Sequence, residues 1–237
     1  MLNANNANVG SSSRQINKLE EYSKLVVSRK KCRLCLGLSN PSCSQLAKYD
    51  SNHIGPWSQW QGNIDSDILL VGQDWGDISY YTKWEGMDQP SGNPTNENLQ
   101  QLLYSIGIKI GKPQERQEQV LFFTNLILCL KQGGLQSQIR KEWLINCSRH
   151  FFYPLVEIID PKIIIALGRN VFESILELYG SPNNKHERFS DIVEHGPVKL
   201  NKSLFLFPVY HCGARGVNIN RPITIQREDW SKITKWL

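Results

Sequence analysis

Residues 160–180 read DPKIIIALGRNVFESILELYG. The run IIIALG at 163–168 is short and apolar, which predicts a buried strand, and NVFESILELYG at 170–180 follows with the spacing of an amphipathic helix. Pro161 ends the helix predicted before the strand. A buried strand followed directly by a helix is typical of a parallel sheet with helical crossovers.

The same alternation extends in both directions along the chain. DILLVG (67–72), VLFFTNLIL (120–128) and LFLFP (204–208) predict further buried strands, and helices are predicted at 93–106, 138–159 and around 228–237. We therefore expect an α/β fold, a three-layer α/β/α domain with a four-stranded parallel sheet. In such sheets ligands bind beyond the carboxyl ends of the strands, so the loops GQDWG, NLILCLKQGG and YHCGARGVNINR should line the site.

The overall properties of the chain fit a single globular domain. Its 237 residues, 40% of them hydrophobic, are enough for one large domain over residues 16–237, beginning with a helix that leads into the first cysteines. Residues 1–15, MLNANNANVGSSSRQ, are rich in Asn and Ser and predict a disordered tail without the apolar core of a secretory signal. No apolar run approaches the ~20 residues that cross a bilayer. The net charge of +5 permits a nucleic-acid partner without demanding one.

Six cysteines in a chain without an export signal indicate a reducing, cytoplasmic compartment, where a disulfide framework would not persist. The C-x-x-C pair in KKCRLC, Cys32 and Cys35, is found in redox proteins, zinc sites and iron–sulfur proteins alike. A thioredoxin-type pair is expected where a strand opens a helix, whereas this pair follows a predicted helix. Together with Cys129 and Cys147 it could hold zinc, and cysteines that are merely buried are a further interpretation.

The order of these motifs resembles the uracil-DNA glycosylase superfamily, and the cysteines resemble its iron–sulfur branch, often called family 4. The resemblance rests on CRLC (32–35), TNLILC (124–129) and CSRHFFYPLVEIIDPKIIIALG (147–168), and it spans roughly residues 31–230. It implies a structural 4Fe-4S cluster, with zinc at the same cysteines as the alternative. The implied ligands are Cys32, Cys35, Cys129 and Cys147. Cys43 and Cys212 have no place in the family pattern.

The resemblance also implies residues that would remove a base. GQDWG (72–76) is similar to the GQDPY motif of the best-known branch, which makes Asp74 the water-activating carboxylate and places Gln73 in the substrate site. Asn125 in FFTN stands at the position of the amide that reads uracil in some branches of the family. A side-chain amide suits this task because it both donates and accepts hydrogen bonds. YHCGARG stands where relatives have HPS or HPA, which makes His211 the donor to the departing base.

Each of these residues also has a structural interpretation. An Asp after a strand often caps a turn or a helix, an Asn in an apolar strand can satisfy neighbouring backbone groups, and a single His is more often structural than catalytic. Placement at three strand ends of one sheet edge favours the functional interpretation.

Departures from the family pattern leave the substrate base open. Trp75, assigned to the substrate site, replaces a proline, and Gly76 replaces the aromatic residue that excludes the methyl group of thymine. The aromatic residue that stacks on the base has no clear match; we assign Tyr80, with Tyr81 and Trp84 as alternatives. Arg215 and Arg221 lie in the loop that replaces the minor-groove wedge and are predicted DNA contacts.

We therefore expect a monomeric enzyme that hydrolyses the N-glycosidic bond of uracil, or of a related deaminated base, in DNA, single strands included, and that has no membrane partner. One alternative is a nucleic-acid-binding protein that retains the fold and the cluster but has lost or altered the catalysis. A second alternative is a cytosolic zinc protein with unrelated small-molecule chemistry.

Overall fold

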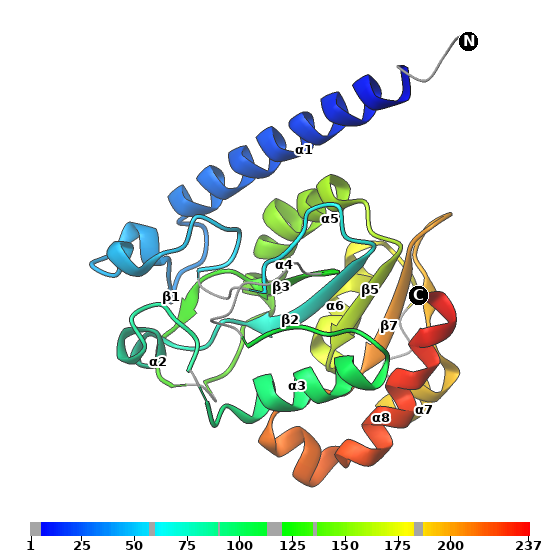
Figure 1. Ribbon diagram of the computed structural model, residues 1–237. Helices are drawn as coiled ribbons and strands as arrows, with labels where there is room; N and C mark the ends of the chain where they lie inside the picture. Colours follow the sequence, from blue (N-terminus) through cyan, green and yellow to red (C-terminus); the bar gives the residue numbers. More distant parts are fainter. Residues whose placement is uncertain (1–5, 57–59, 90, 113–119, 135–136, 183–186) are drawn as a thin grey trace.

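The computed structural model describes residues 6–56, 60–89, 91–112, 120–134, 137–182 and 187–237, and a central sheet runs through it (Figure 1). The strand order is β3-β2-β5-β7-β6. The strands are β2 (Ile68–Asp74), β3 (Leu121–Ile127), β5 (Ile163–Leu167), β6 (Val198–Lys199) and β7 (Phe205–Val209). The first four in this order are parallel, as predicted, and β6 adds an antiparallel edge. A two-residue strand is too short to show a period in the sequence.

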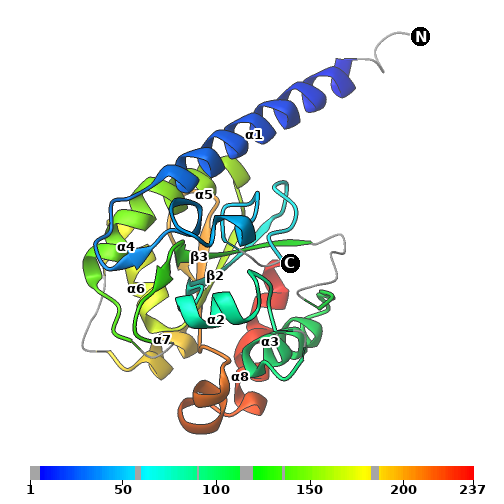
Figure 2. The same ribbon diagram turned by 90° about the vertical axis from the view of Figure 1, so that its left-hand side faces the viewer.

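Helices cover both faces of the sheet, which confirms the three layers (Figures 1 and 2). One face packs against α1 (Asn6–Lys31), α4 (Lys141–Cys147), α5 (Tyr153–Ile159), α6 (Arg169–Leu178) and α7 (Phe189–His195). The other face packs against α3 (Pro94–Ser105) and α8 (Ile223–Ser231). The short helix α2 (Ile78–Lys83) follows β2 at the end of the sheet where its parallel strands finish. Within the described residues, no helix has the length and apolar character that a membrane span requires.

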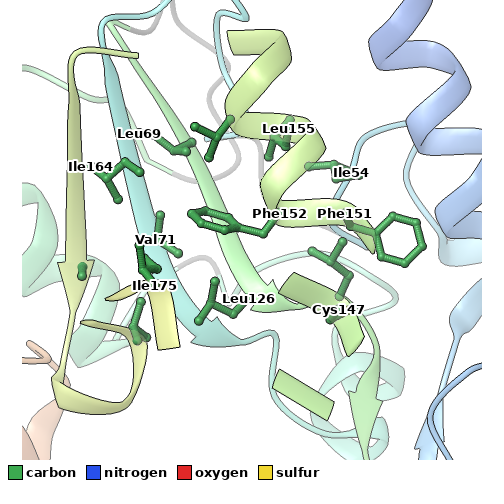
Figure 3. Close-up of a cluster of buried hydrophobic side chains, with 14 of the residues drawn as sticks. Ile54, Leu69, Val71, Leu126, Cys147, Phe151, Phe152, Leu155, Ile164 and Ile175 are labelled. Carbon is green, nitrogen blue, oxygen red and sulfur yellow. The ribbon is translucent and has the colours of Figure 1, made fainter. Parts of the chain in front are cut away.

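The two cores follow from the alternation of side chains along the strands. Leu69 and Val71 of β2 face the layer of α5 and α6, while Ile68 and Leu70 face α3 and α8. Figure 3 shows the first of these cores, where Phe152, from the helical region predicted over 138–159, packs over the sheet. Each such side chain stabilises the fold by about 1.5–3 kcal/mol when it is fully buried.

The helix predicted over 138–159 is a helical run with a wider turn in its middle. A π-helical turn, Ser148–Phe152, separates α4 from α5. Pro154, the second residue of α5, has no N–H to donate to the preceding turn, which accounts for the wider turn. Asp160 then takes a left-handed conformation, φ 55°, and Pro161 prevents the helix from continuing.

The N-terminal segment differs from its prediction. Residues 1–5 lie outside the described residues, but α1 begins at Asn6, so residues 6–15 are helical rather than a disordered tail. Asn, Ser and Gly have low helix propensity, which is why composition alone indicated disorder there. The helix extends away from the body of the molecule at its N-terminal end (Figure 1).

The segment after α1 carries three of the cysteines and is attached to the domain at two places. Its short strand β1 (Leu38–Ser39) pairs antiparallel with β4 (Leu130–Lys131), which follows β3. A buried ion pair anchors its other end: the Arg29 guanidinium donates to both carboxylate oxygens of Asp50, at 2.9 and 2.7 Å, and both side chains are 1% exposed. Arg29 also donates to the carbonyl of His53 at 2.7 Å.

We predict that Arg29→Leu lowers the free energy of unfolding by about 3–5 kcal/mol, because it leaves the Asp50 carboxylate buried without its cation. Urea unfolding measures this change. The matched control is Arg188→Leu, whose side chain is 82% exposed beside Asp191 and whose loss should leave the stability nearly unchanged. Equal effects of the two variants would contradict the role given to the buried pair.

Candidate functional site

A cavity of about 780 Å³ opens beyond the carboxyl ends of the four parallel strands. All three loops predicted to line a site contribute to it, and so does the turn after β5. Its polar lining includes Gln73, Asp74, Asn125, Asn170 and His211. The sequence-predicted residues from β2, β3 and the chain after β7 are therefore brought together in one cavity, as expected for this type of sheet.

Asp74 is the last residue of β2, and its carboxylate is held by three donors. Oδ1 accepts from the backbone N–H of Gly76 at 2.9 Å and lies 3.2 Å from Nζ of Lys131. Oδ2 accepts from the side-chain amide of Gln73 at 3.0 Å. A carboxylate has about four lone-pair positions, so this arrangement leaves about one for a molecule in the cavity.

Both the nitrogen and the oxygen of the Gln73 side-chain amide form hydrogen bonds within the protein. Its nitrogen donates to Asp74, and its oxygen accepts from Nδ2 of Asn170 at 2.9 Å. The sequence placed Gln73 in direct contact with substrate. In the structure it lines the cavity but chiefly links Asp74 to the start of α6.

Asn125 lies on β3 directly beside Gly72 of β2 and is 5% exposed. Its carboxamide oxygen occupies the space that a Cβ atom on Gly72 would fill, so a side chain at position 72 would displace it. Among the described residues, nothing donates to or accepts from the Asn125 amide, although the residue lines the cavity. A buried amide open to a cavity can both donate to and accept from a ligand.

His211 follows β7 by two residues and presents its imidazole to the cavity. Nδ1 accepts from the backbone N–H of Gly213 at 3.0 Å, which places the proton of the neutral ring on Nε2. Solvent reaches the ring through the cavity, but the protein atoms around it remove part of its hydration, and this desolvation lowers the pKa of His211; the nearby Asp74 carboxylate partly opposes the shift. The neutral ring can therefore donate a hydrogen bond from Nε2.

Aromatic rings form one wall of the cavity. Trp75 is 4% exposed and packs edge-on against Phe123, with 5.5 Å between ring centroids. Tyr80 also lines the cavity, and its hydroxyl accepts from the backbone N–H of Gln89 at 3.2 Å. Tyr81 is 1% exposed and belongs to the core. Phe123 was missed by the sequence analysis, although its position two residues before Asn125 places both on the same side of β3.

The two predicted DNA contacts differ in their surroundings. Arg215 is exposed and lines the cavity. The guanidinium of Arg221 makes two hydrogen bonds to Asp229 of α8, at 2.9 and 2.7 Å, and lies 5.4 Å from the ring centroid of Tyr210. Arg221 therefore attaches this loop to α8 through two of its five N–H groups.

Lys131 is the main residue of the cavity that the sequence analysis did not name. It lies in NLILCLKQGG, one of the three loops predicted to line the site, and it is 3% exposed. A lysine in a loop is usually a solvated charge, so only the structure reveals its contact with Asp74.

The cysteines of CRLC, TNLILC and the helical run converge on a second cavity, of about 280 Å³. Its lining includes Cys32, Cys35, Cys43, Cys129 and Cys147. Burial raises the pKa of Cys147 to about 12 and raises that of Cys129 further, and the neighbouring thiols add to both shifts. All six cysteines are free thiols. Over the part of the chain that the structure describes, no three His, Cys, Asp or Glu residues form a group suited to a metal ion.

The two cysteines outside the family pattern have different surroundings. Cys43 lines the thiol cavity, and its Sγ donates to the carbonyl of Lys30 at 3.2 Å near the end of α1. Cys212 is fully buried beside His211, and its Sγ donates to the carbonyl of Thr95 at 3.5 Å. Cys212 thereby connects the chain after β7 to α3.

Comparison with known families gives a match to the model described as the uracil DNA glycosylase superfamily, over residues 59–233. The comparison with curated proteins found no match. The matched range contains the whole central sheet and the cavity beyond its strands, while Cys32 and Cys35 precede it. Because the match covers most of the chain and includes the site, the protein belongs to the uracil DNA glycosylase superfamily.

Proposed function

We propose that the protein hydrolyses the N-glycosidic bond of uracil, or of a related deaminated base, in DNA. The observation that carries the proposal is the single cavity in which Asp74, Asn125 and His211 meet. Base removal needs a group that directs water, a group that reads the base and a group that stabilises the departing base, and these three side chains have the matching chemistry.

Asp74 would direct the attacking water. Three donors hold its carboxylate, so the remaining lone pair has a defined direction and can accept a hydrogen bond from one water molecule. The carboxylate also favours positive charge on the sugar as the bond to the base breaks.

Asn125 and His211 would act on the base itself. The open amide of Asn125 can donate to O4 of uracil and accept from N3–H, a pattern that cytosine does not match. The uracil leaves as an anion, and the Nε2–H group of neutral His211 can donate to its O2. The base would enter this cavity only after rotating out of the nucleic-acid stack. In the cavity the ring of Tyr80, Trp75 or Phe123 would offer it a surface.

We further propose that Cys32, Cys35, Cys129 and Cys147 hold a structural 4Fe-4S cluster. The thiols surround a cavity of about 280 Å³, whereas a single zinc ion bound at about 2.3 Å draws its four sulfurs into direct contact with it. Thiolates are suited to iron–sulfur clusters, and burial, with repulsion from the neighbouring thiols, raises the pKa of Cys129 and Cys147, so these two are hard to ionise without a bound cation. When bound, the cluster would connect the segment after α1 to β3 and α4.

The test of the proposed function is release of the free base from a labelled oligonucleotide, single- and double-stranded, that contains uracil, hypoxanthine, xanthine or a mispaired thymine. We expect Asp74→Asn to slow release of the preferred base by about 10²–10⁴-fold while DNA affinity changes little, because the amide keeps the shape of the carboxylate but activates water poorly. Salt-sensitive DNA binding by the wild type without release of any of the four bases would support the binding-protein alternative instead.

The pH dependence tests the role of His211. Its lowered pKa means that the folded protein keeps the ring neutral to a pH below the usual value of 6.5, so the rate should hold from about pH 8 to about 6.5 and decline only below that. Single-turnover rates across this range measure it. His195→Asn is the control, since that ring is 77% exposed at the end of α7. A decline of the wild-type rate centred above about pH 6.5 would contradict the assignment.

Metal analysis tests the cluster. Protein purified without oxygen should be brown and contain iron and sulfide in equal amounts, and Cys129→Ser should lose most of both, because serine is a poor ligand for iron in such clusters. Cys212→Ser is the matched control, a buried thiol from outside the thiol cavity, and should keep them. Colourless wild-type protein with one zinc ion would show that the alternative metal is correct.

A further inference from the structure

Lys131 places a buried ammonium group beside the carboxylate proposed to direct water. The residue ends β4, lines the cavity, and has its Nζ atom 3.2 Å from Oδ1 of Asp74. The two side chains are 4% and 10% exposed, so water screens the pair much less than it would at the surface.

The backbone of Lys131 is attached to the same loop independently of its side chain. Its N–H donates to the carbonyl of Gly76 at 3.0 Å, and it forms an isolated parallel bridge with Asp77. Gly76 in turn donates its N–H to Oδ1 of Asp74. A change of the side chain alone therefore leaves the backbone contacts between β4 and this loop in place.

The three donors to Asp74 are not equivalent. Gly76 is a near neighbour of Asp74 in the chain, and Gln73, its direct neighbour, links it to Asn170 at the start of α6. Lys131 comes from a different strand and fixes the carboxylate relative to the rest of the cavity. It is also the one group of the three that carries a charge, so its contact with the carboxylate is an ion pair.

We propose that Lys131 is a positioning residue for Asp74: its ammonium group holds the carboxylate so that the remaining lone pair faces the attacking water. This inference rests on the proposed function. The pair is close to neutral as a whole, so the direction in which Asp74 accepts a hydrogen bond contributes more to the reaction than its charge does.

The test compares Lys131→Met, Lys131→Arg and the wild type in single-turnover base release at saturating enzyme. Lys131→Met should slow release by about 10²-fold, because a carboxylate displaced by about 1 Å no longer directs water correctly. Affinity for the uncleaved oligonucleotide should change by less than about threefold. Lys131→Arg should recover most of the rate, since it restores a cation at this position. The control is Lys162→Met, which removes an exposed lysine from an ion pair with Asp67; the two residues directly precede β5 and β2, at the opposite ends of these strands from the cavity.

A double-mutant cycle separates positioning from a general effect on the fold. If Lys131 acts through Asp74, then Lys131→Met combined with Asp74→Asn should be no slower than Asp74→Asn alone. Additive losses in the double variant, or an unchanged rate in Lys131→Met when the wild type is active, would overturn this proposal and leave the proposed function standing. A wild type that releases no base would overturn the proposed function and this assignment with it.

Discussion

The pairing of β2 with β3 is the constraint on which the site depends. The register places Gly72 beside Asn125, and the absence of a side chain on Gly72 provides the space that the Asn125 amide occupies. The same register brings Asp74 level with Ile127 of β3. A shift by one residue would turn Leu69 and Val71 away from their core and move both polar groups off the cavity. The hydrophobic pattern of two strands therefore sets the geometry of the chemistry.

Much of this arrangement could be predicted from the sequence, because strands that are apolar throughout have an unambiguous pattern. The presence of four parallel strands and the meeting of their end loops follow from that pattern and from the rules of α/β sheets. Asp74, Asn125 and His211 were found through the resemblance of GQDWG, FFTN and YHCGARG to motifs of the family, and each lies at or near the end of such a strand. Phe123 could have been found by the same reasoning, through the alternation of side chains along β3.

The remaining features depend on contacts between distant parts of the chain, which spacing does not reveal. Nothing near Lys131 in the sequence indicates that its ammonium group reaches Asp74, because the contact requires the turn after β3 to fold back beside β2. Arg221 was predicted to contact DNA because it lies in the loop that replaces the minor-groove wedge of relatives, but it forms an ion pair with Asp229 of the next helix. The early start of α1 was missed because its first residues are weak helix formers.

The balance of charge in the cavity determines what each group can contribute. Lys131 offsets the charge of Asp74, and desolvation keeps His211 neutral, so the departing base would meet a hydrogen-bond donor rather than a full positive charge. Such a donor is effective where water is scarce and where it already points at the developing charge. Gly213 sets that direction, because its N–H holds Nδ1 and leaves the proton on Nε2. The backbone N–H of Gly213 therefore sets which nitrogen of His211 carries the proton. With the proton on Nε2, the neutral imidazole would be able to donate a hydrogen bond to the departing base at neutral pH.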